Sequence, residues 1–327
     1  MKRFAKIVGI LFVVLIVVTG GAFAWASSTA ASRLAKVYET HRVEIPVPVP
    51  LSGHERSQIG ESDPTAVALE RAIERGKHLV ESRYACTECH GKDFAGGTMI
   101  DDPAIGGFFG PNITLGKGGA VAAYTSSDWD RIVRHGVLPD GRPALMPSID
   151  FAEMSDQELS DIIALIQSMP PVDRERKPSH LGPIGKVLVA TEQLKPSAGT
   201  PEMTRERHES DPPPTAETVE FGKHMVAVCT GCHSVSLAGG TILGGDPSWP
   251  PAANLTQHTE GLAGWSSDDF SKALLTGQSK DGRKLRPPMD GMAQYASKMS
   301  STELKAMWAY LQSVPALPTP GGKLAAK

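Results

Sequence analysis

The chain has 327 residues, enough for two domains that each bury a core of their own. Its formal net charge is −3 and its Lys and Arg residues are scattered, so we expect no nucleic-acid partner. The composition includes 33 Gly and 26 Pro but only 6% aromatic residues, which is typical of short helices joined by many turns.

Residues 1–32 have the pattern of an export segment. Three cationic residues precede an uncharged run from Ile7 to Ser32 whose apolar part is Ile7 to Val18, and the cationic flank should stay in the cytoplasm. Ala24-Trp25-Ala26 fits a cleavage site, whereas the length of the run also suits a membrane span, which we slightly favour. Cleavage predicts a periplasmic protein. Retention of the membrane span predicts a periplasmic protein that is tethered to the inner membrane.

The rest of the chain alternates between predicted spacers and helical domains. Helical spacing of apolar residues over 66–82 and 219–228 predicts the first helix of each domain. Capping boxes predict the start of each last helix, at Ser155 and at Ser300. We therefore expect an all-α fold with a spacer at 33–64, domains at 65–171 and 215–316, a Pro-rich linker at 172–214 and a flexible tail at 317–327.

All four cysteines fall in two Cys-x-x-Cys-His motifs, within "YACTECHGK" and "AVCTGCHSV". This pattern is the attachment signature of c-type haem, in which each thiol adds to a vinyl group and the imidazole binds iron. A redox dithiol needs no trailing His, and a structural zinc site needs four ligands in one cluster. The motifs predict two covalently bound haem c groups, attached through Cys86, Cys89, Cys229 and Cys232, with His90 and His233 as iron ligands.

The similarity between the two halves extends well beyond these motifs. "PNIT" at Pro111–Thr114 matches "ANLT" at Ala253–Thr256, and "YTSSDWDRIVRHGVLPDGR" aligns without a gap to "WSSDDFSKALLTGQSKDGR". The offset of about 140 residues indicates one whole domain per repeat, plus a connector.

A second axial ligand is required if each haem is to transfer electrons without binding small molecules, and methionine is the usual choice. In the first repeat, Met146 lies in a Pro-rich loop between two helices, whereas Met154 adjoins the capping box and is expected in the core. His135 is the alternative ligand, although its repeat partner is Thr276. We predict that Met146 binds the first iron.

In the second repeat the distal ligand is Met289 or Met292. Met299 is excluded because it aligns with Met154, and the preceding Pro287-Pro288 favours Met289. His78 and His224 occupy matching Gly-Lys-His positions, and we expect surface or packing roles for both.

These residues resemble the bacterial di-haem cytochrome c family, which has tandem class I cytochrome c domains. The chain is similar to the cytochrome subunits of membrane-associated alcohol and sugar-acid dehydrogenases, in which "PNIT", "D-G-R" and "P-P-M" recur in each haem domain. The resemblance implies that Met146 and Met289 complete the two iron sites. It departs at "PPMDGM", which lacks the proline that usually follows the ligand.

The leading hypothesis is electron transfer in the periplasm. The protein would carry electrons between a dehydrogenase or quinol-oxidising complex and a terminal acceptor such as an oxidase, with catalysis left to these partners. The alternatives are a di-haem cytochrome c peroxidase, which needs one open distal site and acid/base groups above it, and a haem-based sensor.

Overall fold

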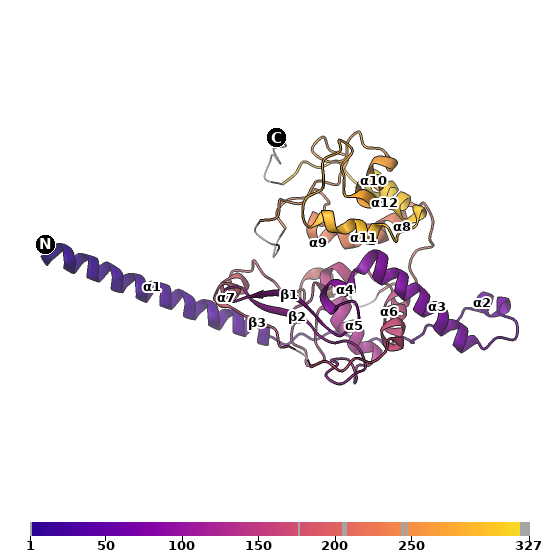
Figure 1. Ribbon diagram of the computed structural model, residues 1–327, viewed down its shortest axis with the longest axis horizontal. Coiled ribbons are helices and arrows are strands. Elements are labelled where there is room, and N and C mark those ends of the chain that lie inside the picture. Colours follow the sequence, from indigo (N-terminus) through magenta and orange to yellow (C-terminus); the bar gives the residue numbers. More distant parts are fainter. Residues whose placement is uncertain (1, 176, 205–207, 243–244, 246–247, 321–327) are drawn as a thin grey trace.

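The computed structural model describes residues 2–175, 177–204, 208–242, 245 and 248–320, so residues 321–327 of the predicted tail lie outside the described part. Figure 1 shows two helical bodies in contact, with one long helix leaving the side of the first. The predicted predominance of helices is confirmed.

The first body is enclosed by its first and last helices, α3 (Pro64–Leu79) and α6 (Asp156–Ser168). Asp63 caps α3 by accepting a hydrogen bond from the Thr65 amide, and the two helices cross at Gly76, where a Cβ would meet the backbone of Asp161. Between them lie the elements η1 (Val80–Tyr84), α4 (Cys86–His90), α5 (Ser126–His135) and η2 (Ser148–Phe151).

The second body repeats this arrangement with α8 (Val219–Val226) and α12 (Ser301–Ser313). Gly222, the repeat partner of Gly76, lies against the Ala306 carbonyl with no room for a Cβ. Glycine at this point therefore sets how closely the two helices approach in both bodies. The remaining elements are η4 (Ala227–Cys229), α9 (Thr230–His233), α10 (Ser267–Thr276), η5 (Met289–Met292) and α11 (Ala293–Ala296).

Each body has its own hydrophobic core. The first is built around residues such as Trp129, Leu159 and Ile163, and the second around Phe270 and Trp308. Met154 is buried in the first core and Met299 packs against the second, as the sequence predicted for these two methionines.

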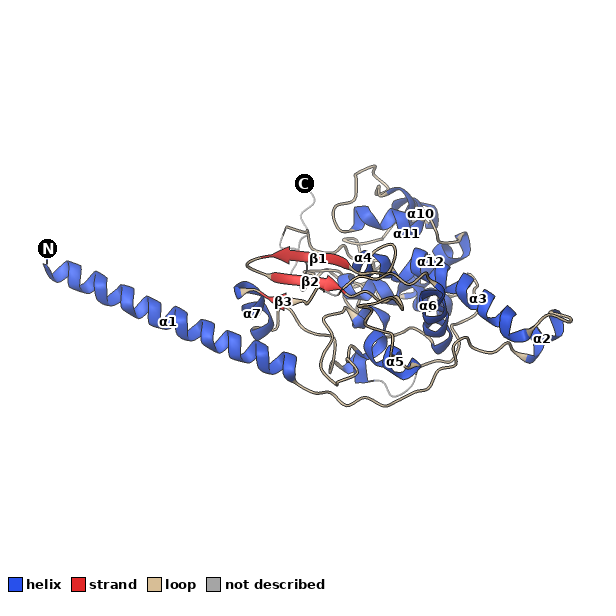
Figure 2. Ribbon diagram, turned by 60° about the horizontal axis from the view of Figure 1, so that its bottom comes forward, coloured by secondary structure: helices blue, strands red, loops and turns tan. Residues whose placement is uncertain are grey.

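A small antiparallel sheet accompanies the first body, with strands in the order β1 (Gly97–Asp102), β2 (Gly106–Gly110) and β3 (His180–Leu181). Gly97 pairs with Gly110, and Gly106 pairs with Leu181 of the connector. The sequence analysis did not predict these strands, because the segment is rich in Gly and has no sustained alternation of apolar and polar residues. Figure 2 shows the sheet beside α7 (Pro183–Ala190), another part of the connector.

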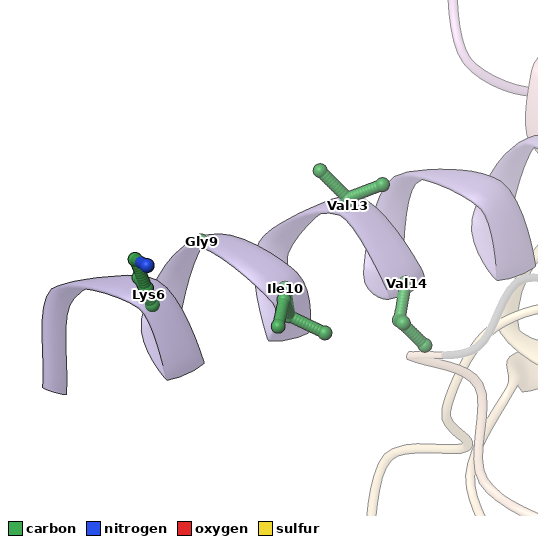
Figure 3. Close-up of a pocket in the computed structure, with 5 residues that line it drawn as sticks. All are labelled: Lys6, Gly9, Ile10, Val13 and Val14. Carbon is green, nitrogen blue, oxygen red and sulfur yellow. The ribbon is translucent and has the colours of Figure 1, made fainter. Parts of the chain in front are cut away.

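The N-terminal helix α1 (Lys2–Ala35) extends far beyond the first body (Figure 1). It reaches a mean hydropathy of 2.7 and is the one helix among the described residues that is long and apolar enough to cross a membrane. A shallow hollow on α1, lined by Lys6, Gly9, Ile10, Val13 and Val14, is shown in Figure 3; it belongs to the exposed apolar surface of this helix.

The C-terminal end of α1 is packed against the connector. Ala26 and Ala30 are 1% exposed, and α1 packs beside α7. Arg33 donates a hydrogen bond to the Val189 carbonyl at 2.8 Å and pairs with Glu192 at 3.0 Å. The connector therefore holds the base of the long helix.

The predicted spacer crosses the surface of the first body instead of hanging free. Ile45 is buried in the first core, with Val43 and Val47 packed beside it. The Ile45 amide donates to the Ser126 hydroxyl at 3.0 Å, and a short helix, α2 (Gly53–Gln58), follows. We call residues 36–52 the strap, since they bind α1 to the first body.

Two reciprocal histidine–glutamate bonds join the bodies. His78 of the first body donates to Glu303 of the second at 2.8 Å, and His224 of the second donates to Glu158 of the first at 2.9 Å. Both glutamates also close the capping boxes of α6 and α12. Matching residues thus make the same contact in both directions, as at the interface of a symmetric dimer. The two histidines therefore join the bodies, a more specific role than the predicted surface or packing one.

Glu158 carries the more deeply buried of these two bonds. Burial alone would raise the pKa of Glu158, but the hydrogen bond from His224 and the charge of Arg83, 2.8 Å away, lower that pKa to about 2. Arg83 also donates to the His224 carbonyl. The buried carboxylate of Glu158 thus binds Arg83 of the first body and His224 of the second.

We predict that Glu158→Gln lowers the free energy of unfolding at pH 7 by about 3 kcal/mol, because it leaves Arg83 buried without its anion. The depressed pKa stabilises the wild type above pH 4.5, and this contribution disappears as the pH falls towards 2. Urea titrations followed by circular dichroism at several pH values measure both effects.

The matched control is Glu217→Gln, which removes an exposed pair with Lys305 and should change stability by less than about 0.5 kcal/mol. Equal stability of Glu158→Gln and the wild type at pH 7 would contradict the assigned role of Glu158.

Candidate functional site

The two Cys-x-x-Cys-His motifs form short helical turns, which we call the attachment turns. The first is α4, after η1, and the second comprises Cys229 at the end of η4 and α9. The amide of Gly96 donates to the His90 carbonyl at 2.8 Å, and the amide of Gly239 donates to the His233 carbonyl at 3.0 Å. In the first body Gly110 also lies against the Cys89 carbonyl with no space for a Cβ. The glycines after each motif thus let the chain fold back closely over the turn.

Each motif histidine is oriented by a backbone carbonyl. His90 Nδ1 donates to the Pro111 carbonyl at 3.0 Å, and His233 Nδ1 donates to the Ala253 carbonyl at 2.7 Å. This bond places the proton on Nδ1 and leaves the lone pair of Nε2 for a metal. Burial lowers the pKa of both imidazoles, which keeps them in the neutral form that binds iron.

The carbonyls come from the first residues of "PNIT" and "ANLT", which explains why proline and alanine are interchangeable there. The next residue, Asn112 or Asn254, is 1% exposed and secures the segment. Asn112 Nδ2 donates to the Val172 carbonyl at 2.8 Å, and Asn254 Nδ2 donates to the Leu317 carbonyl at 2.7 Å. The asparagines thereby tie the orienting loop to the chain that leaves the last helix.

The four cysteines are free thiols in the structure, and all lie within its described part. Cys86 packs against the first core and Cys229 against the second, and this burial raises the pKa of each thiol to about 12. A redox dithiol works through a thiolate of lowered pKa, so the environment is the opposite of what that chemistry requires. Each motif instead places a neutral imidazole and two thiols in apolar surroundings. This environment fits the covalent attachment of haem c.

The predicted distal methionines lie in matching segments of the two bodies, Met146 between α5 and α6 and Met289 between α10 and α12. Met146 is half-buried, and its carbonyl accepts a hydrogen bond from Ser197 of the connector at 3.2 Å. Met289 is half-buried at the start of η5, whereas Met292 at its end is 36% exposed. The difference in burial favours Met289, and the assignment of both distal ligands stays a prediction.

The alternative ligand His135 is occupied elsewhere. It is 1% exposed, and its Nδ1 donates to the Met203 carbonyl at 2.8 Å, with His41 and His208 around its ring. These contacts involve the strap and the linker, not the attachment turn.

Each attachment turn also touches the opposite body, a contact that sequence reasoning missed. Asp150, in the loop that follows Met146, fills the space beside Gly231 of the second motif. Glu88, inside the first motif, accepts hydrogen bonds from Tyr295 and Gln294 of the second body. The methionine loop of each body therefore lies on the haem-attachment turn of the other. No local sequence signal marks these residues, because their partners are distant in the chain.

Comparison with known proteins supports two domains of one kind. The family model for cytochrome c matches residues 219–315, and that for subunit III of cbb3-type cytochrome c oxidase matches residues 71–166. The chain carries two cytochrome c domains. These matches cover both attachment motifs, and with the relatives below they confirm the predicted pair of covalently bound haem c groups.

The chain has relatives that include cytochrome subunits of dehydrogenases and a diheme cytochrome. It is 28% identical to the cytochrome c subunit of a quinone-dependent alcohol dehydrogenase from Gluconobacter oxydans, over 77% of this chain and 56% of the relative. It is 27% identical to the cytochrome subunit of fructose dehydrogenase from Gluconobacter japonicus, over 78% and 55%. A diheme c-type cytochrome from Cereibacter sphaeroides is 25% identical over 78% of this chain and 90% of the relative. The chain thus spans about half the length of the two dehydrogenase subunits.

Proposed function

We propose that this cytochrome is a periplasmic electron carrier. It takes electrons from a membrane-bound dehydrogenase, of the kind whose cytochrome subunits it resembles, or from a quinol-oxidising complex, and passes them to a terminal acceptor such as an oxidase. The names of the relatives, which include subunits of alcohol, fructose and gluconate dehydrogenases, support the first source. The protein itself catalyses no substrate reaction in this proposal.

Haem c supplies a reversible one-electron iron couple, and the protein residues position it and limit access to it. The carbonyl-bound histidines would bind the iron through Nε2, and the methionines would supply its second protein ligand. The proposed attachment residues are Cys86, Cys89, Cys229 and Cys232, and the proposed axial ligands are His90, Met146, His233 and Met289.

The observation that carries the proposal is the reciprocal contact at the attachment turns. Asp150 lies against Gly231 in one direction, and Tyr295 bonds to Glu88 in the other. Because each attachment turn lies at the interface, cofactors bound to these turns would be attached close to the contact between the two bodies. Such an arrangement suits electron passage between domains of one chain, without diffusion.

We predict that Gly231→Ala slows electron redistribution between the two haems, because a Cβ at this position displaces the Asp150 carboxylate from its contact with the attachment turn. The measurement uses the full haem-loaded chain, reduced with less than one electron per molecule and freeze-quenched for electron paramagnetic resonance. The wild-type rate should not depend on protein concentration.

The control is Gly53→Ala, in α2 and outside both haem motifs, where an added Cβ meets nothing within 4 Å. A wild-type rate that rises in proportion to protein concentration would contradict transfer within the chain. Failure of membranes supplied with alcohol, fructose or gluconate, and separately with quinol, to reduce the cytochrome would contradict the proposed donors.

We also propose that α1 is retained as a membrane anchor. Burial of Ala26 where α1 packs beside the connector, and the bonds of Arg33 to the connector, support a helix that stays part of the folded protein. The mature protein should then be extracted from membranes by detergent but not by salt, and its intact mass should include residues 1–26. A mass that begins at Ser27 would overturn the anchor.

The choice between Met289 and Met292 can be tested with carbon monoxide. Met289→Ala should open a coordination position and allow the reduced second haem to bind carbon monoxide, whereas Met292→Ala should leave it closed. Absorbance spectra of the reduced variants give the result. If Met292→Ala is the variant that opens the site, the ligand assignment is wrong and the carrier survives; if the wild type already binds carbon monoxide, the peroxidase or sensor alternative gains support.

A further inference from the structure

A buried cluster of metal-binding side chains lies outside the two haem sites, where three segments of the chain meet. His41 comes from the strap, Asp130 and His135 from α5, and His208 from the linker. One ligand atom each of His41, Asp130 and His135 lies within 4.8 Å of the others. Asp130 is 0% exposed and His135 is 1% exposed, so most of the cluster is shielded from solvent.

The hydrogen bonds leave electron pairs facing one another in this cluster. His135 Nδ1 donates to the Met203 carbonyl, so its Nε2 presents a lone pair 3.6 Å from Asp130 Oδ2. Neither Asp130 Oδ2 nor His41 Nε2 has a hydrogen-bond partner, although both atoms are buried. His135 Nε2 has one neighbour within hydrogen-bond distance, His208 Nε2, at 3.3 Å. Buried polar atoms left without partners, such as Asp130 Oδ2 and His41 Nε2, are costly, and a bound cation removes that cost.

The charged neighbours are compatible with a cation. Arg134 donates to Asp130 Oδ1 at 2.7 Å and also pairs with Asp156 at 2.8 Å, so one positive charge is shared by two carboxylates. Arg131 donates to Thr40 of the strap and lies 4.0 Å from Asp128. Arg134 therefore fixes one oxygen of Asp130 and leaves the other directed at the histidines.

We propose that His41, Asp130 and His135 bind a zinc-class divalent metal ion, with His208 as the fourth ligand. His208 Nε2 lies 3.3 Å from His135 Nε2. Tetrahedral zinc with bonds of 2.0–2.1 Å places its ligands about 3.3 Å apart, close to the two ligand separations seen here. The ligand atom of His41 lies within 4.8 Å of those of Asp130 and His135, so it needs to approach them by at most about 1.5 Å to reach this spacing. His41 is only half-buried, on the strap, which leaves room for that movement.

The set of donors favours zinc over the other common divalent ions. Calcium and magnesium prefer oxygen ligands throughout, whereas imidazole with one carboxylate suits zinc. The bond from His135 Nδ1 to a backbone carbonyl is the outer contact that metal-bound histidines usually make. A site closed by four protein ligands would be structural, and it would fasten both the strap and the linker to the first domain.

The test measures zinc and iron in the full haem-loaded protein after treatment with a chelator and reconstitution with zinc sulfate. The haem-loaded form is required because the cysteines are then blocked. Elemental analysis should give one zinc for every two irons. X-ray absorption at the zinc edge should show nitrogen and oxygen ligands at about 2.0–2.1 Å and no sulfur.

His41→Ala and His135→Ala should each weaken zinc binding by at least about 100-fold in competition with a chromogenic chelator. His54→Ala, an exposed histidine in the same spacer, is the matched control and should bind zinc like the wild type. His41 lies on the strap, so His41→Ala leaves α5 intact and the haem spectrum of this variant should be unchanged. An unchanged spectrum distinguishes loss of a zinc ligand from misfolding.

A site with four protein ligands should hold one zinc for every two irons. The proposal would be overturned if the reconstituted wild type contained fewer than about 0.1 zinc per two irons. Unchanged zinc affinity in both His41→Ala and His135→Ala would overturn it as well. Either result would identify the cluster as a proton-linked hydrogen-bond network.

Discussion

The bond from a motif histidine to a backbone carbonyl is the constraint around which each domain is arranged. An imidazole can present Nε2 to iron only if its other nitrogen holds the proton, and the carbonyls of Pro111 and Ala253 ensure that. The carbonyl must itself be held still. Buried Asn112 and Asn254 do so by bonding to the segment that follows the last helix. The attachment turn, the orienting loop and the end of the helical pair thus form one connected unit.

The same unit occurs twice, and its repetition explains how the domains meet. A contact between equivalent residues of two similar bodies can be made in both directions, which doubles its contribution without new chemistry. His78 with Glu303 and His224 with Glu158 are such a pair. The glutamates already serve as helix caps, so one side chain stabilises both a helix and the interface. The interface in turn brings the methionine loop of each domain onto the attachment turn of the other.

The two domains differ in what surrounds them. The first is crossed by the strap, extended by a small sheet and contacted by the connector helix α7. In the described part of the second, the pairing that begins this sheet is represented by a single bridge between Gly240 and Ala252. These additions link the first domain to α1, the helix suited to a membrane. The cluster of His41, Asp130 and His135 lies where the strap meets α5. The additions therefore gather on the domain that carries the membrane-suited helix.

The sequence by itself determined the features whose chemistry lies in neighbouring residues. Haem attachment depends on five consecutive positions, a capping box on four, and a membrane-length helix on one apolar run, so each could be predicted without a fold. The tertiary structure alone decided which distant groups meet. His78 and Glu303 are 225 residues apart, and His135 and Met203 are 68 apart. No periodicity encodes such pairs, because they depend on how helices cross at Gly76 and Gly222 and on where the strap and linker cross the surface.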